Sequence, residues 1–133
     1  MYIEIILTPR FSDTDAAGHI NNTAVTQWLE AGRLDFNLNH LPEVPPMMLR
    51  RIEVDYDREM THLESALIRT GVERVGNKTV TMRQEIWQGG ICRAQALAVD
   101  CYFDPATRRA TEVPERFREI YRGLMFNDAG TGS

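Results

Sequence analysis

Apolar positions divide the chain into one short strand, one long helix and a run of extended segments. Residues 2–7 are rich in isoleucine and end before Pro9, which has no amide hydrogen to donate to a sheet. After the polar stretch at residues 12–22, apolar or small residues recur at helical spacing: Val25, Trp28, Leu29, Gly32 and Phe36. This spacing predicts a helix that begins near residue 22 and buries one face.

Gly32 falls in the middle of the predicted helix. Glycine at such a position costs about 1 kcal/mol relative to alanine. A glycine kept at that cost is typical of a close approach by another part of the chain. We therefore expect a neighbouring backbone to pass close to Gly32.

Extended structure is predicted for most of the chain after the prolines at positions 45 and 46. Strands are expected at residues 49–56, 65–74, 79–87 and 91–103. Two glycine-containing turns separate the last three strands: Gly76-Asn77 and Gly89-Gly90. A short helix is expected from Pro114 to Arg122, because proline suits the first position of a helix.

The last two predicted strands each have one side that is expected to face the core. In the strand at residues 79–87 this side holds Val80, Met82 and Ile86. In the strand at residues 91–103 it holds Leu97, Val99, Cys101 and Phe103. The other side of that last strand carries small or apolar residues: Ala94, Ala96, Ala98 and Tyr102. Because this second side is too apolar for a solvated surface, we expect a partner subunit to cover it.

Length and composition indicate a single globular domain, with 133 residues, 43% hydrophobic and 26% charged. We expect the domain to occupy residues 1–126 and residues 127–133 to form a flexible tail. The net charge is -4 and the basic residues form no block, so nucleic-acid binding is not expected. No apolar stretch approaches the roughly 20 residues of a membrane span, and no signal peptide is apparent, so we expect a cytoplasmic protein without membrane contact.

Chemically useful residues are concentrated from Asp13 to Arg33, where the sequence reads DTDAAGHINNTAVTQWLEAGR. Backbone amides in the first turn of a helix have no acceptor within the helix and lie at the positive end of its dipole, so they can stabilise an oxyanion. Gly18 lets the preceding loop approach that end without a side chain in the way. A carboxylate just upstream can then attack a carbonyl, or activate water against it.

This segment resembles the signature of hotdog-fold thioesterases related to 4-hydroxybenzoyl-CoA thioesterase. That signature runs Asp, any residue, Asp, two small residues and Gly, followed by the helix, and the order of elements from Tyr2 to Arg122 is similar as well. The resemblance implies an α+β protein in which a curved antiparallel sheet of about five strands wraps around one long central helix. It also implies hydrolysis of an acyl-CoA thioester to a free acid and coenzyme A by a homodimer or homotetramer.

The resemblance further implies roles for individual residues. Asp15 matches the second Asp of the signature and would act as nucleophile or general base on the thioester carbonyl. The amide of Asn22 would hold the carbonyl oxygen, helped by Gly18 and His19. Contacts to coenzyme A are implied for three residues: Lys78, Thr79 and Asn21. The sequence departs from the pattern at Val25, where many relatives carry a tyrosine.

Simpler roles remain open for several of these positions. Asp13 is expected to set the geometry of the loop through backbone hydrogen bonds. His19 is as suited to satisfying local backbone groups as to orienting substrate or water, and Asn21 and Asn22 are good helix caps. Lys78, in a hairpin turn, is typical of a solvated charge. No Cys or second His lies near His19 in the sequence, so no metal site is expected.

Two other functions are compatible with the same fold. Hotdog hydratases and dehydratases pair an Asp with a His, and Asp15 lies four residues before His19, although their motif is spaced differently. A non-catalytic hotdog protein would bind acyl groups without turnover. The carrier of the acyl group is left open between coenzyme A and an acyl carrier protein. No cofactor is expected beyond the coenzyme A that belongs to the substrate.

Overall fold

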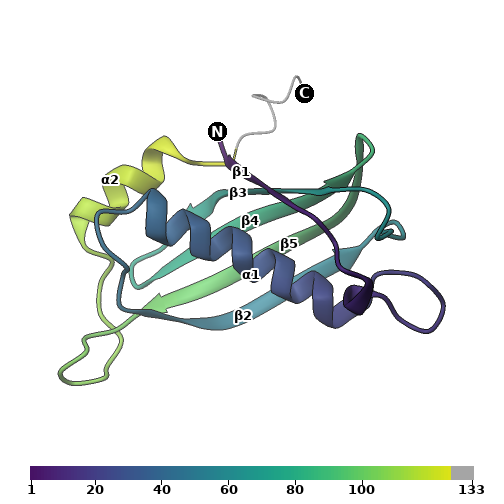
Figure 1. Ribbon diagram of the computed structural model, residues 1–133. Coiled ribbons are helices and arrows are strands. Elements are labelled where there is room, and N and C mark those ends of the chain that lie inside the picture. The colour runs from purple at the N-terminus through teal and green to yellow at the C-terminus, as the bar shows by residue number, and fades with distance from the viewer. Residues whose placement is uncertain (127–133) are drawn as a thin grey trace.

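The computed structural model describes residues 1–126, in which five antiparallel strands form one sheet beside a long helix (Figure 1). The elements in chain order are β1 Ile3–Leu7, a 3-10 turn at Phe11–Asp13, α1 Asn22–Asn39, β2 Met47–Tyr56, β3 Ala66–Val75, β4 Thr79–Gln88, β5 Ile91–Tyr102 and α2 Glu115–Gly123. This is the hotdog arrangement expected from the resemblance, and each predicted strand and helix is confirmed to within a few residues. The tail predicted at residues 127–133 lies outside the described residues.

The sheet has the strand order β1-β3-β4-β5-β2, so β1 and β2 form its two edges. Helix α1 runs along one face of the sheet and contacts β1, β3 and β4 (Figure 1). Helix α2 packs near the carboxyl end of α1, where Phe117 and Tyr121 join a core cluster that includes Phe36 and Tyr102. No helix within residues 1–126 has the length and apolar character needed to cross a membrane.

The buried face of α1 is the face that its sequence predicts. Its buried residues are Ala24, Val25, Trp28, Leu29, Gly32 and Phe36. The helix begins after Asn21, whose side-chain Oδ1 accepts a hydrogen bond from the Ala24 amide at 2.7 Å. Leu34 lies on the side away from the sheet and is exposed. The helix is therefore fixed both by a cap at its first turn and by a continuous apolar stripe.

The two faces of β5 are the reverse of those that its sequence pattern predicts. The small residues Ala94, Ala96 and Ala98, together with Tyr102, face α1 and belong to the core. Leu97, Val99 and Cys101 lie on the outer face and are only half-buried. The physical reason is that α1 brings bulky side chains to this sheet, and the facing strand must be small to accommodate them. The alanines are covered by the chain's own helix and not by a partner subunit.

Gly32 packs against β3 and β4 with no space for a side chain. A Cβ atom there would lie 2.7 Å from Thr70 Oγ1 and 2.9 Å from both Gln84 Nε2 and Ile68 Cγ2. The close approach predicted at Gly32 is confirmed, but the neighbours are side chains and not backbone. Gln84 is fully buried and donates from Nε2 to the carbonyl of Leu29 at 2.8 Å and to Thr70 Oγ1 at 3.0 Å. It cannot move aside without breaking these bonds.

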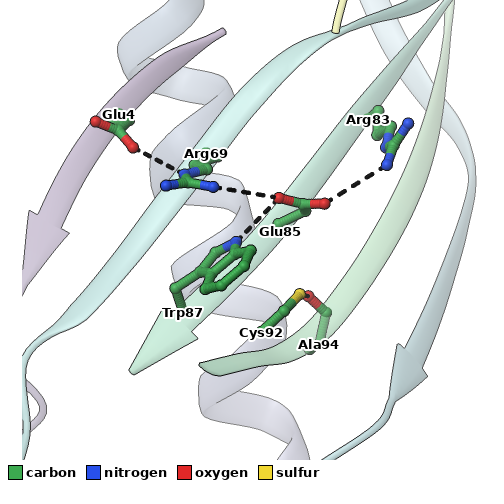
Figure 2. Close-up of polar contacts among 7 residues, drawn as sticks. All are labelled: Glu4, Arg69, Arg83, Glu85, Trp87, Cys92 and Ala94. Atoms are coloured by element: carbon green, nitrogen blue, oxygen red, sulfur yellow. Dashed lines mark hydrogen bonds and ion pairs between the residues drawn. The ribbon is translucent and has the colours of Figure 1, made fainter. Parts of the chain in front are cut away.

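The outer face of the sheet carries a charge network that joins the edge strand β1 to β3 and β4 (Figure 2). Arg69 is 2.8 Å from Glu4 and 3.8 Å from Glu85, and its guanidinium lies over the rings of Trp87 and Tyr2. Trp87 Nε1 donates to Glu85 Oε1 at 2.9 Å. Glu85 is only 8% exposed, which a carboxylate tolerates when it is paired and hydrogen-bonded. The network therefore anchors the short strand β1 by its side chains as well as by its backbone.

Cys92 lies beside this network on β5 (Figure 2), and its thiol is not involved in a disulfide bond. Burial raises the pKa of the Cys92 thiol to about 11, and the negative charges of Glu85 and Asp57 act in the same direction. The thiolate is the reactive form of cysteine. At neutral pH the Cys92 thiol is therefore held mainly in its protonated, weakly nucleophilic form.

Replacing Gly32 with alanine is expected to destabilise the protein, even though alanine favours a helix by about 1 kcal/mol. The added methyl group would meet three side-chain atoms at less than 3.0 Å, and such overpacking costs roughly 1–3 kcal/mol. Urea denaturation should show a net loss of about 1 kcal/mol in the free energy of unfolding. The control is Gly123→Ala in α2, where no atom lies within 4 Å of the added Cβ. A Gly32→Ala protein as stable as the wild type would contradict the tight contact.

The Cys92 thiol is expected to react slowly with iodoacetamide near neutral pH and progressively faster as the pH rises toward its pKa of about 11. Alkylation can be followed by mass spectrometry in a Cys101→Ser variant, in which Cys92 is the only thiol that can react. The same protein unfolded in urea serves as the reference, because there the thiol regains an ordinary pKa of about 8.5. Equal rates in the folded and unfolded proteins near neutral pH would show that Cys92 is not shielded.

Candidate active site

The loop before α1 is held in place by Asp13, which is 3% exposed. Its Oδ2 accepts from the Arg10 amide at 2.9 Å, its Oδ1 lies 3.0 Å from Arg10 Nη2, and its carbonyl accepts from the Asn21 amide at 2.8 Å. Burial would raise the pKa of Asp13, but the hydrogen bonds and charge of Arg10 outweigh it and hold the pKa below its ordinary value. The structural role predicted for Asp13 is confirmed.

Asp15 lies in the exposed part of the same loop, and its carboxylate is oriented by the loop itself. Its Oδ1 accepts from the backbone amides of Ala17 at 2.8 Å and His19 at 3.1 Å. The turn is closed by main-chain bonds from Asp15 to His19 and from Gly18 to Asp15, and Gly18 has a φ of 84°, which favours glycine. Oδ2 accepts no hydrogen bond from the described residues. Asp15 therefore presents one oriented and unoccupied oxygen.

The first turn of α1 supplies unpaired hydrogen-bond donors beside this loop. The Ala24 amide is capped by Asn21 Oδ1, and the Val25 amide bonds to the Asn21 carbonyl at 3.3 Å. Within residues 1–126, the amides of Asn22 and Thr23 have no acceptor. They lie at the positive end of the helix dipole, where an anionic oxygen is stabilised. This arrangement leaves two backbone donors free at the start of α1, beside the Asp15 loop.

Asp15 and Asn22 line the same pocket, which has a volume of about 220 Å³. Its other lining residues come from the loop, from α1 and from the end of β2 with the segment that follows: His19, Ile20, Val25, Tyr56, Arg58, Glu59 and Met60. The amide of Ile20 donates to the carbonyl of Met60 at 3.1 Å, and His19 Nε2 lies 3.3 Å from Glu59 Oε2. The pocket thus lies between two loops that are bonded to each other.

The motif around Asp15 does not predict the wall formed by Tyr56, Arg58, Glu59 and Met60. These residues lie about 40 positions after Asp15 and reach the pocket because the segment at 57–65, between β2 and β3, folds back onto the loop. The sequence contains one indication that residues 57–65 have a functional role. The segment is longer than a hairpin turn and rich in charged residues, which is typical of a functional loop.

The structure does not bring Lys78 and Thr79 into this pocket. Thr79 is the first residue of β4 and Lys78 directly precedes it, whereas the pocket lies near the Gln88 end of that strand, where Gln88 binds Thr61 beside Met60. Nine steps at roughly 3.3 Å separate the two ends of β4 by about 30 Å. Within one chain Lys78 therefore cannot contact a thioester at Asp15. The side chain of Asn21 caps α1 and lines a separate hollow with Arg10.

The histidines near the pocket are not arranged as metal ligands. Among residues 1–126, no group of three or more His, Cys, Asp or Glu side chains could hold a metal ion. His19 faces Glu59, and His62 packs edge-on against Phe11 with ring centroids 6.0 Å apart. The Nδ1 atom of His62 is buried and has no hydrogen-bond partner in the described part of the chain.

Comparison with known proteins identifies the family. Residues 9–120 match the profile of the thioesterase-like superfamily. The structure of a predicted thioesterase from Bacillus stearothermophilus is similar, with 34% identity, a TM-score of 0.89 and coverage of 96% of this chain and 98% of that one. No curated protein matches the sequence.

Two further solved structures share the fold at lower identity. A thioesterase from Thermus thermophilus, complexed with coenzyme A and Zn, has 24% identity, a TM-score of 0.84 and coverage of 91% of this chain and 92% of that one. A 4-hydroxybenzoyl CoA thioesterase mutant, complexed with 4-hydroxybenzoyl CoA, has 18% identity, a TM-score of 0.80 and coverage of 90% and 98%. The family profile spans most of the chain and agrees with the fold, so this protein belongs to the thioesterase-like superfamily and is a thioester hydrolase.

Proposed function

We propose that this protein hydrolyses an acyl-CoA thioester to a free carboxylic acid and coenzyme A, with Asp15 as the catalytic carboxylate. The observation that carries the proposal is that Asp15 and Asn22 line one pocket, with a carboxylate oxygen of Asp15 and the first-turn amide of Asn22 both unpaired within residues 1–126. Coenzyme A as the carrier is supported by the two similar structures solved with coenzyme A or 4-hydroxybenzoyl CoA bound. An acyl carrier protein is the alternative carrier.

The thioester carbonyl would be held with its oxygen at the Asn22 amide. As the carbonyl carbon is attacked, negative charge develops on that oxygen, and a fixed N–H donor at a helix start stabilises the charge more than it stabilises the ground state. Because Asp15 Oδ1 is engaged by two backbone amides, Oδ2 is the oxygen that acts. It either attacks the carbonyl carbon, giving an anhydride that water then hydrolyses, or takes a proton from the attacking water. In both routes the C–S bond breaks and the coenzyme A thiolate leaves.

Gly18 and His19 support Asp15 in this proposal. The left-handed backbone at Gly18 turns the loop so that the His19 amide reaches Asp15 Oδ1. The His19 imidazole lies beside Glu59 and does not contact the Asp15 carboxylate. A hydratase that pairs an Asp with a His side chain is therefore less well supported than a thioesterase.

The working form is proposed to be a homo-oligomer, with a dimer as the minimum. Strand β2 is a ten-residue edge that pairs only with β5 among the described residues, and it exposes Met48 and Leu49. A long strand edge with unpaired backbone groups is a template for pairing with a second chain. The end of β2 also lines the pocket at Tyr56, so a second chain along β2 would lie beside the active site.

Such a second subunit is the proposed source of the Lys78 and Thr79 contacts to coenzyme A. Within one chain these residues are separated from Asp15 by about the length of β4, roughly 30 Å. A neighbouring subunit can place its own β4 start beside this pocket. A tetramer built from two dimers, and a cytoplasmic location, remain predictions.

Asp15→Asn and Asp15→Ala are expected to lower kcat/KM by about 100-fold or more, because both remove the acting carboxylate oxygen. Asn retains an oxygen that can accept the Ala17 and His19 amides, so the loop should keep its shape. The measurement is thiol release from a panel of acyl-CoA substrates. Undiminished release by both variants would refute the assignment of Asp15.

Asp104→Asn is the matched control for this experiment. Asp104 Oδ1 accepts from the Ala106 amide at 2.9 Å, the same two-residue turn that Asp15 makes with Ala17, but Asp104 lies outside the pocket. The Asp104→Asn variant should release thiol as fast as the wild type. If acyl-CoA is bound without thiol release, the non-catalytic alternative is favoured, and loss of enoyl-CoA absorbance without thiol release favours the hydratase.

A Met48→Lys, Leu49→Lys double variant is expected to dissociate the oligomer, because two charges on the β2 edge oppose strand pairing. Light scattering after gel filtration should give the wild type at least twice the chain mass of 15.2 kDa and the variant the mass of one chain. Ile6→Lys places a charge on the exposed side of the opposite edge strand and serves as the control. A wild type that is monomeric and fully active would contradict the proposal.

A further inference from the structure

Gln88, the last residue of β4, has a side-chain amide whose hydrogen-bonding groups are all engaged by one loop. It is 1% exposed. Its Oε1 accepts from the Thr61 amide at 3.0 Å, and its Nε2 donates to the carbonyls of Thr61 at 2.7 Å and Glu64 at 3.1 Å. A primary amide has two N–H donors and one carbonyl oxygen, so each of these groups has a partner. All three partners are main-chain atoms of the segment at 57–65.

This segment has little other regular support. It lies between β2 and β3 and has no ladder of strand pairing of its own. Arg93, just after the β4–β5 turn, holds its first part, because the Arg93 carbonyl accepts from the amides of Asp57 and Arg58, both at 2.9 Å. The Arg93 guanidinium donates to the Glu59 carbonyl at 2.7 Å. Gln88 holds the second part, so the two residues that flank one hairpin bind main-chain atoms in both halves of the segment.

The segment held in this way forms one wall of the pocket. Arg58, Glu59 and Met60 line the pocket, and Met60 is directly followed by Thr61. The Met60 carbonyl accepts from the Ile20 amide at 3.1 Å, which joins the segment to the Asp15 loop. Gln88 itself does not line the pocket. Any effect of Gln88 on substrate must therefore pass through the main chain at Thr61 and Met60.

We propose that Gln88 is a positioning residue of the active site, which fixes the Arg58–Met60 wall relative to Asp15. Its kinetic consequence rests on the proposed thioesterase function. The Asp15 carboxylate is oriented within its own loop, by Ala17 and His19, and does not need Gln88 for that. Loss of Gln88 should therefore loosen contacts between the substrate and the wall more than it alters the attacking oxygen. The expected signature is a rise in KM with a smaller change in kcat.

Two substitutions separate hydrogen bonding from shape. Gln88→Met keeps the length of the side chain but leaves three main-chain groups without their partner. Gln88→Glu keeps the acceptor for the Thr61 amide but turns an oxygen toward the two carbonyls that Nε2 now serves. We expect Gln88→Glu to be the more disruptive of the two, although glutamate is closer to glutamine in shape.

Gln84→Met is the matched control. Gln84 lies four residues earlier on the same face of β4 and is 0% exposed, but its amide bonds to Leu29, Thr70 and Arg33 instead of the 57–65 segment. The control should lower Tm, as any loss of a buried hydrogen-bonded amide does. It should leave the segment and the pocket wall in place.

The test combines hydrogen exchange at the Thr61 amide with steady-state thiol release from acyl-CoA. Both Gln88 variants should exchange Thr61 about tenfold faster or more than the wild type, in line with a local opening, and Gln84→Met should not. Both should raise KM about tenfold with kcat changed by no more than about threefold, and the shift should be larger for Gln88→Glu.

Unchanged exchange at Thr61 in both Gln88 variants would overturn the inference, whatever the activity. Faster exchange with unchanged KM would also overturn it, since the segment would then be held by Gln88 without positioning the pocket. Equal changes in Gln84→Met would assign the effect to general destabilisation and reject a positioning role. If the wild type releases no thiol, the proposed function fails, while exchange at Thr61 still decides whether Gln88 holds the segment.

Discussion

The close packing of α1 on β3 and β4 is the contact on which the rest of the site depends. Gly32 allows the helix to approach until the atoms of Thr70, Gln84 and Ile68 fill the space a side chain would take. Gln84 also donates a hydrogen bond to the carbonyl of Leu29, which adds to this packing. Because the helix is fixed in this way, the unpaired amides of its first turn have a definite position. A donor can stabilise a developing charge only if it is already in place.

The loop before α1 shows how two carboxylates of the same type acquire different tasks. Asp13 is buried, bound to Arg10, and joined through its carbonyl to Asn21 at the helix cap. Asp15, two residues later, is exposed and keeps one oxygen without a partner in the described chain. Asp13 stabilises the loop, and the loop holds Asp15 with one carboxylate oxygen exposed. Burial and pairing separate the two roles, and residue type alone does not.

The sequence predicts the elements well because helices and strands leave periodic patterns that depend on local geometry. It predicts the wrong side of β5 because both faces of that strand are apolar, and alternation alone does not say which face meets the helix. Residue size distinguishes the two faces, since alanines suit a strand that is covered by the bulky side chains of α1: Ala94 and Ala96 cluster with Trp28 and Leu29, and Ala98 clusters with Phe36. The motif similarly indicates the chemistry of Asp15 but not the wall opposite it. That wall is placed by Gln88 and Arg93, which are distant in sequence and follow no pattern.

The two tryptophans of the chain lie on opposite faces of the sheet. Trp28 belongs to α1 and is buried between that helix and the inner face of the sheet, whereas Trp87 lies on the outer face under the Arg69 guanidinium and bonds to Glu85. Their fluorescence consequently reports on different events. Emission from the first follows separation of the helix from the sheet, and emission from the second follows release of the amino-terminal strand that Arg69 ties down. Variants that retain only one of the two tryptophans can thus show whether unfolding begins with separation of α1 from the sheet or with release of β1.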